Sequence, residues 1–118
     1  MLSITERQSG DATILDLEGS VIMGGGSARL REHVRRLIED GRKQILLNFA
    51  RVKYIDSSGV GELVASLLAL NRRGGRLKLL NLSEKVEEIL TLSSLRTFFE
   101  VYDDESQALA DDASADGQ

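Results

Sequence analysis

The stretch Tyr54-Ile55-Asp56-Ser57-Ser58-Gly59-Val60-Gly61 joins two segments with different hydrophobic patterns. A short apolar run, residues 45–49, precedes it and is typical of a strand covered on both faces. The apolar residues at its end and beyond recur at helical spacing: Val60, Leu63, Val64, Leu67 and Leu68. We therefore expect this stretch to form the crossover from a strand to a helix.

Three polar side chains in succession, Asp56, Ser57 and Ser58, favour the start of a helix at this point. Their short oxygens accept hydrogen bonds from the free N–H groups of a first helical turn. Gly59 and Gly61 fit a tight turn with close approach of the helix to a neighbouring strand. A cap needs only one oxygen, however, and the end of a strand in an α/β pattern is where binding sites usually lie. The motif alone is compatible with a simple cap and with a functional site.

Composition restricts the class of protein. The chain has 118 residues, of which 42% are hydrophobic and 29% charged, as in one soluble globular domain. A net charge of −4 argues against direct nucleic-acid binding, because that requires a basic face. Without cysteine, disulfides and thiolate catalysis are excluded. No apolar run approaches the ~20 residues of a membrane span and no leader peptide is recognisable, so we expect a cytoplasmic protein.

Before the central motif, the pattern predicts an antiparallel hairpin followed by a helix. Residues 2–6 and 12–17 read as strands separated by a turn-forming segment. A glycine-rich loop, residues 19–27, leads to a helix with Ser27 as its expected N-cap and an apolar face formed by Leu30, Val34, Leu37 and Ile38. The loop lacks the phosphate-binding pattern G-x-x-x-x-G-K-[ST], so we do not expect it to bind a nucleotide.

The first helix also carries charged residues and the single histidine. Glu32 and Arg36 stand four apart, the spacing of a helix-surface ion pair. His33 lies at the edge of the apolar stripe, and without cysteine or a second histidine we expect no metal site there.

After the motif, Gly74-Gly75 is expected to end the central helix, and residues 77–82 to form a strand. Ser83 should begin a helix with four residues facing inward: Val86, Ile89, Leu90 and Leu92. Residues 97–102 are predicted as the last strand. Asp104 should begin a short final helix around Ala108 and Leu109.

This order predicts an α/β fold in a single domain, residues 1–110. Its mixed β-sheet would open with the antiparallel hairpin, and its helices would pack mainly on one face. Residues 111–118 are acidic and polar, and we expect them to form a disordered tail.

The motif from Asp56 to Gly61, in this arrangement of strands and helices, resembles the STAS-domain family of anti-sigma factor antagonists. The resemblance covers about residues 1–110 and implies a STAS-like fold. It implies that Ser57 is the phosphorylation site and that Asp56, Ser58, Gly59 and Val60 take part in partner binding. The implied partners are an anti-sigma factor with serine kinase activity, which the unphosphorylated protein would bind to release a sigma factor, and a serine phosphatase. Where the family usually has Gly-Glu-Leu-Asp, this chain has Gly19-Ser20-Val21-Ile22, so an acidic group near the phosphorylation site is missing.

The residue inventory does not favour an enzyme. Ser57 is not in a G-x-S-x-G motif, and His33, the only histidine, is expected on a different helix. We therefore expect no catalytic residues and no cofactor. The alternative to a phosphorylation switch is a STAS-like scaffold or accessory subunit that is never phosphorylated, which the altered segment 19–22 favours. The sequence leaves the oligomeric state open.

Overall fold

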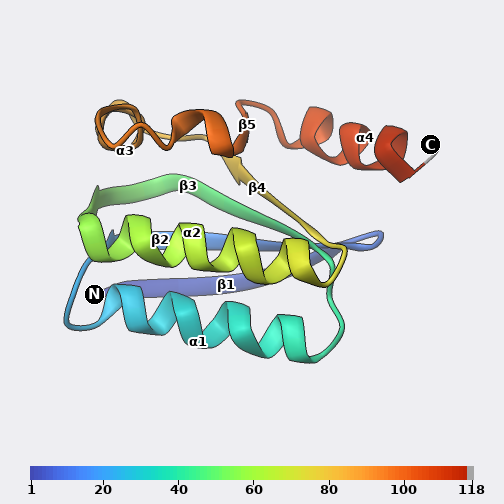
Figure 1. The fold of residues 1–118 in the computed structure, drawn as a ribbon, viewed down its shortest axis with the longest axis horizontal. Helices are drawn as coiled ribbons and strands as arrows, with labels where there is room; N and C mark the ends of the chain where they lie inside the picture. The colour runs from blue at the N-terminus through green and yellow to red at the C-terminus, as the bar shows by residue number, and fades with distance from the viewer. Residues whose placement is uncertain (117–118) are drawn as a thin grey trace.

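The computed structural model describes residues 1–116, and strands alternate with helices after an opening hairpin (Figure 1). The strands β1 to β5 are Leu2–Ser9, Ala12–Val21, Gln44–Ile55, Arg76–Leu80 and Glu100–Tyr102. The helices α1 to α4 are Gly26–Glu39, Ser57–Arg72, Glu84–Leu92 and Glu105–Asp116, and the 3₁₀ turn η1 is Arg96–Phe98. The predicted α/β class is confirmed.

The five strands form one mixed sheet in the order β1-β2-β3-β4-β5. β1 pairs with β2 in antiparallel orientation, and all other neighbours are parallel. Ser9 pairs with Ala12, which leaves Gly10 and Asp11 as a two-residue turn. Gly10 has φ of +60°, a conformation that glycine adopts without strain. The predicted opening hairpin is therefore confirmed.

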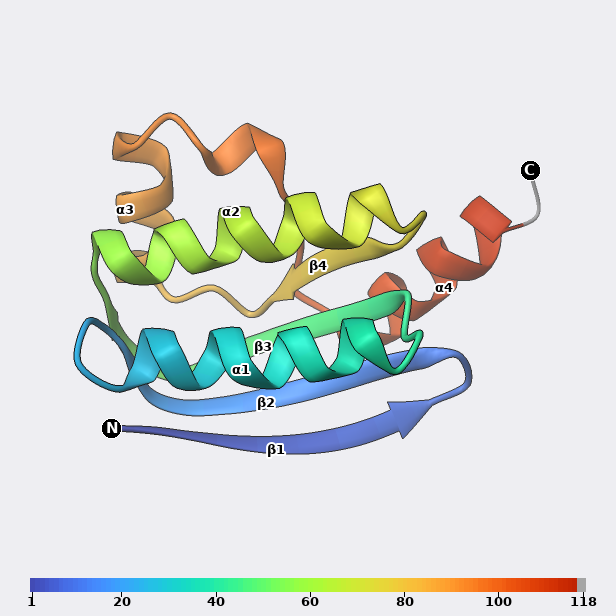
Figure 2. The ribbon, with the colours of Figure 1, turned by 60° about the horizontal axis from the view of Figure 1, so that its bottom comes forward.

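Most of the core lies between one face of the sheet and the helices. α1 and α2 lie side by side over this face, which we call the helix-covered face (Figure 2). The predicted apolar side of α1 is buried here: Leu30, Val34, Leu37 and Ile38. β3 contributes every second residue of its first half, namely Ile45, Leu47 and Phe49. The prediction that helices pack mainly on one face is confirmed.

The opposite face of the sheet, which we call the α4 face, carries a second and smaller apolar cluster under α4. Its buried members are Ala12, Ile14, Leu46 and Ala108. Lys78 is also buried on β4, and its Nζ donates to the carbonyl oxygen of Ala108 at 2.6 Å. The Lys78 ammonium lies 5.1 Å from the centroid of the Tyr102 ring. Thus the docking of α4 buries a charged residue that the sequence pattern did not single out.

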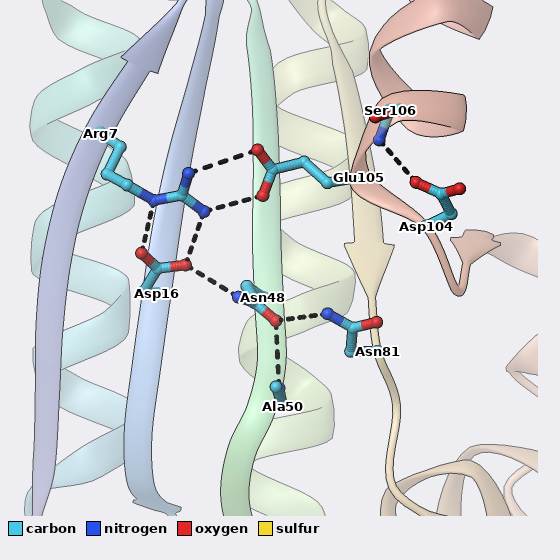
Figure 3. Close-up of polar contacts among 8 residues, drawn as sticks. All are labelled: Arg7, Asp16, Asn48, Ala50, Asn81, Asp104, Glu105 and Ser106. Carbon is cyan, nitrogen blue, oxygen red and sulfur yellow. Dashed lines mark hydrogen bonds and ion pairs between the residues drawn. The ribbon is translucent and has the colours of Figure 1, made fainter.

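A polar network joins α4 to the same face of the sheet (Figure 3). Arg7 of β1 donates to both carboxylate oxygens of Asp16 at 2.6 and 3.0 Å, and to both oxygens of Glu105 at 2.8 and 3.3 Å. Asn48 donates to Asp16 at 2.8 Å and accepts from Asn81 at 3.0 Å. The network therefore connects β1, β2, β3, the end of β4 and α4 through directional bonds.

Several predicted helix ends are confirmed. The Ser83 side chain accepts from the N–H of Val86, which caps α3. α2 ends at Arg72, as expected just before Gly74, where φ is +77°, and the N–H of Gly75 donates to the carbonyl of Leu70 at 2.7 Å. Asp104 accepts from the N–H of Ser106 at 2.9 Å and starts α4 (Figure 3).

Other local predictions were wrong. The last strand is only Glu100–Tyr102, because residues 96–98 form the turn η1 and only three residues pair with β4. The preceding strand ends at Leu80, since Asn81 takes φ of +58°. Leu92 is 78% exposed, because the side of α3 that carries Val86 and Leu90 faces the core.

On α1, Glu32 pairs with Arg35 at 2.9 Å instead of Arg36, and Arg35 also reaches Glu39. Three and four residues are both suitable spacings on a helix surface, and the sequence does not choose between them.

The proposed boundary between a domain, residues 1–110, and a tail, residues 111–118, falls inside α4, which the structure continues to Asp116. Residues 117–118 lie outside the described residues, and the predicted tail stays a prediction. No helix within residues 1–116 is long and apolar enough to cross a membrane.

Candidate functional site

The central motif forms the junction between the end of β3 and the start of α2, as predicted. Asp56 is the N-cap of α2, with φ of −113° and ψ of −174°. Its Oδ1 accepts from the N–H of Gly59 at 3.0 Å and from the hydroxyl of Ser58 at 2.6 Å. Its Oδ2 accepts from the N–H of Met23, in the loop after β2, at 2.9 Å. The carboxylate therefore fixes the loop after β2 to the first turn of α2.

These bonds lower the pKa of Asp56 from its usual 3.8 to about 2. The N–H of Met23 has the largest effect, followed by the Ser58 hydroxyl and the N–H of Gly59. All three are neutral donors, and they favour the ionised carboxylate. Asp56 consequently carries a negative charge at neutral pH, next to the free N–H groups of a helix.

Ser58 is half-buried, and both functions of its hydroxyl are in use. It donates to Asp56, so its single proton is committed. The second contact, between the Ser58 and Ser27 hydroxyls at 2.6 Å, must then have Ser27 as donor. Ser27 is 7% exposed and belongs to the first turn of α1. Its predicted role as N-cap was wrong, since α1 starts after Gly25 without a side-chain cap, and Ser27 links the two helices instead.

Ser57 differs from its neighbour because it is exposed at the first position of α2. Within residues 1–116 its hydroxyl makes no hydrogen bond. It lies at the positive end of the helix dipole. Of the two adjacent serines, only Ser57 presents an uncommitted hydroxyl to solvent.

Gly59 and Val60 are both buried and contribute to the shape of the site from within. A Cβ on Gly59 would lie 2.2 Å from the carbonyl oxygen of Val21, so only glycine fits between α2 and the end of β2. Val60 is 5% exposed and belongs to the main core. Neither residue presents much side-chain surface to solvent. The partner-binding roles of Asp56, Ser58, Gly59 and Val60 stay predictions.

The structure adds an exposed surface that the sequence analysis did not identify. Beyond Ser57, the outward side of α2 carries Gly61, Ala65 and Leu68, all exposed. Met23 is 75% exposed at the tip of the loop bonded to Asp56. A surface helix normally shows polar residues outward. The sequence could have indicated this surface, because apolar and uncharged residues recur on more than one side of α2 and leave its outward side without charge.

Comparison with known proteins agrees with this geometry. The STAS domain family model matches residues 3–108. The anti-sigma-B factor antagonist of Staphylococcus aureus is 31% identical over 72 residues, which cover 61% of this chain and 67% of that protein. The chain therefore belongs to the STAS domain family, and the predicted resemblance to its anti-sigma factor antagonists is confirmed.

Solved structures show the same fold. A protein of Thermotoga maritima described as a candidate anti-sigma factor antagonist superposes with a TM-score of 0.86 at 26% identity, covering 92% of both chains. The anti-sigma factor antagonist SpoIIAA in its unphosphorylated form superposes with a TM-score of 0.80 at 24% identity, covering 95% of this chain and 97% of that chain. The latter likeness concerns the fold alone.

Proposed function

We propose that this protein is an anti-sigma factor antagonist in the cytoplasm, switched by phosphorylation of Ser57. The observation that carries the proposal is the difference between the two serines: Ser57 is exposed and free, whereas the Ser58 hydroxyl is held between Asp56 and Ser27. In the unphosphorylated state the protein would bind an anti-sigma factor that is also a serine kinase, and thereby release a sigma factor. It would be a substrate of that kinase, not an enzyme.

Phosphorylation would change charge more than shape. The γ-phosphoryl group of ATP would pass to the Ser57 oxygen as the bond to ADP breaks and the hydroxyl proton is lost. The product adds close to two negative charges at neutral pH. The start of α2 favours that charge through its free N–H groups, so the fold need not rearrange. A serine phosphatase would reverse the step by hydrolysis of the phosphate ester.

A partner seated on this surface would be expelled by the new charge. The exposed residues around Ser57 are mostly uncharged, and Asp56 already carries a negative charge beside it. Burying a phosphate dianion there without a matched cation costs several kcal/mol, by the general penalty for unpaired buried charge. An effect of about 3 kcal/mol corresponds to roughly two decades in affinity. The switch thus requires no conformational transition.

The proposal is tested by pull-down from the native cytoplasm with wild type, Ser57→Ala and Ser57→Asp as baits, with the intact mass and phosphorylation site of each bait recorded. We expect wild type and Ser57→Ala to retain an anti-sigma factor with kinase activity, and Ser57→Asp to lose it. Ser106→Asp is the matched control, because Ser106 is also an exposed serine in the first turn of a helix but lies on α4, away from the site, so this bait should keep the partner.

Identical partners for all baits, with no phosphate on the chain, would reject the switch. That result would instead support the alternative of a non-phosphorylated scaffold or accessory subunit. Turnover of a small molecule by the purified protein would contradict the view that it is not an enzyme.

A further inference from the structure

A groove of about 420 Å³ lies between α1 and α2, away from the sheet. Its apolar lining comes from Val34 and Ile38 of α1 and from Ala65 and Ala69 of α2, next to the buried Ser66. The floor residues that α2 contributes are small, which leaves space between the two helices unfilled. Ala65 is exposed and Ala69 half-buried, whereas Val34 and Ile38 lie almost fully buried beneath them, so the two alanines form most of the accessible apolar floor.

The rim of the groove is charged, with more positive than negative residues. Six charged residues line it: Arg31, Arg35, Arg72, Arg73, Glu39 and Glu62. Four arginines against two glutamates leave a surplus of two positive charges, whereas the whole chain carries −4. This local reversal of sign favours an acidic ligand.

The surplus is concentrated at one end of the groove. Arg31 pairs with Glu62 at 3.1 Å, and Arg35 pairs with Glu39 at 3.3 Å. Arg73 donates to the carbonyl oxygen of Ile38 at 3.3 Å, which leaves its charge uncompensated. Within residues 1–116, neither Arg72 nor Arg73 forms an ion pair with a carboxylate. Two guanidinium groups are thus available where α2 ends.

We propose that this groove binds an acidic amphipathic helix of a partner protein. Ala65 and Ala69 are one helical turn apart on α2, and their small side chains allow close approach of apolar residues that recur every three or four positions on a third helix. Carboxylates flanking that apolar stripe would meet Arg72 and Arg73. Arginine suits this role because its planar fork binds a carboxylate through two hydrogen bonds.

The groove goes beyond the proposed function, because it acts independently of the phosphorylation switch. Arg72 follows Ser57 by fifteen residues on one helix, which corresponds to about 22 Å at 1.5 Å per residue. Charges in solution are screened over about 8 Å at physiological ionic strength. A phosphate on Ser57 would therefore leave binding in the groove unchanged.

The experiment is an NMR titration of the full chain, labelled with ¹⁵N, against a synthetic helical peptide of about 14 residues with a leucine stripe flanked by glutamates. A second peptide with lysine in place of each glutamate is the chemical control. We expect the acidic peptide to shift the amide signals of Val34 and Ala65, and Arg72→Glu to weaken its binding about tenfold or more.

Arg36→Glu is the matched control variant. Arg36 is the basic residue in the last turn of α1, and Arg72 is the basic residue in the last turn of α2. Both are exposed, but Arg36 does not line the groove. Both substitutions change the charge equally and oppose the helix dipole in the same way. Arg36→Glu and Ser57→Asp should each leave peptide affinity within about twofold, an effect well under 1 kcal/mol.

The proposal is overturned by equal binding of the lysine peptide, by signal shifts elsewhere on the molecule, or by no saturable binding. It is also overturned if the groove signals shift with protein concentration alone, since a second copy of the chain would then be the occupant. None of these results bears on Ser57, so the phosphorylation switch would stand or fall separately.

Discussion

The two faces of the sheet are built in different ways. The helix-covered face buries a continuous apolar cluster that includes residues of β1 to β4 and of α1, α2 and α3. The α4 face has a small apolar cluster at one end and a network of charged and amide groups beside it. Apolar burial is non-directional and scales with area, whereas each polar contact depends on geometry and contributes little net free energy. We expect most of the stability to come from the helix-covered face.

The largest expected loss of stability tests this difference on two neighbouring leucines of β3. Leu46 and Leu47 are both fully buried, Leu47 in the main cluster and Leu46 in the cluster under α4. Replacing a buried leucine by alanine costs about 2–5 kcal/mol, depending on how far the surroundings collapse. We expect Leu47→Ala near the upper end and Leu46→Ala near the lower end, because α4 can shift to fill the space. Urea unfolding of the two variants measures both costs.

An equal or larger cost for Leu46→Ala would mean that the α4 face contributes as much to stability as the helix-covered face. The comparison requires that the slope of free energy against urea be the same in both variants, so that only stability has changed.

A second test concerns packing at the site end of the helix-covered face. Gly59→Ala should destabilise the protein by about 1–3 kcal/mol, because its Cβ would overlap the Val21 carbonyl oxygen. Gly61→Ala is the control in the same helical turn, with nothing within 4 Å of its Cβ. It should instead stabilise the protein by about 0.5–1 kcal/mol through helix propensity. Thermal unfolding distinguishes them, and equal effects would show that α2 moves freely relative to β2.

The helix-covered face is also the part that the sequence predicted best. The buried side of α1, the apolar run in the first half of β3 and the cap at Ser83 follow from local periodicity and local hydrogen bonding. The start of α2 at Asp56 was predictable for the same reason. The sequence also placed two hydroxyls, those of Ser57 and Ser58, side by side at this helix start. It did not show which hydroxyl is occupied, since this depends on Ser27, which lies 31 residues away.

The α4 face was not predicted because its contacts are distant in sequence and unspecific in pattern. Arg7 and Glu105 are 98 residues apart, and either would pass for an ordinary surface residue. Lys78 stands between leucines of a strand, where alternation favours exposure, and only the docking of α4 buries it. Likewise, the turn η1 takes the place of only the start of the predicted last strand, because β5 pairs with β4 over three residues.

A third and smaller effect is expected for Arg7→Ala, which breaks the link between the sheet and α4. Arg7 is 42% exposed, and ion pairs of such exposed groups contribute about 1 kcal/mol or less. We expect a loss of this size in urea unfolding, with faster amide hydrogen exchange in the first turn of α4 than elsewhere. Arg35→Ala on α1, which removes two ion pairs within one helix, should leave exchange in α4 unchanged. A loss comparable to that of Leu47→Ala would contradict the contrast between the faces.

The smallest expected effect is the response to salt of the pKa values of two carboxylates, Asp56 beside the helix-covered face and Asp16 on the α4 face. Both have a pKa below the usual 3.8, that of Asp56 at about 2. The hydrogen bond from the charged Arg7 is the main cause of the lowered pKa of Asp16. For Asp56 the pKa is lowered by neutral donors, of which the N–H of Met23 has the largest effect. Because the folded-state pKa is depressed, each group contributes stability above the pKa of the unfolded chain, and this is lost as pH falls through the folded-state value.

Salt distinguishes the two causes. At about 1 M NaCl the screening length falls to roughly 3 Å, which weakens the attraction between Asp16 and Arg7 but not hydrogen bonds from neutral groups to Asp56. In a carboxyl ¹³C NMR titration we expect salt to raise the pKa of Asp16 toward its usual value and to leave that of Asp56 low. Equal movement of both would mean that charge, and not the neutral donors around Met23, holds Asp56 ionised.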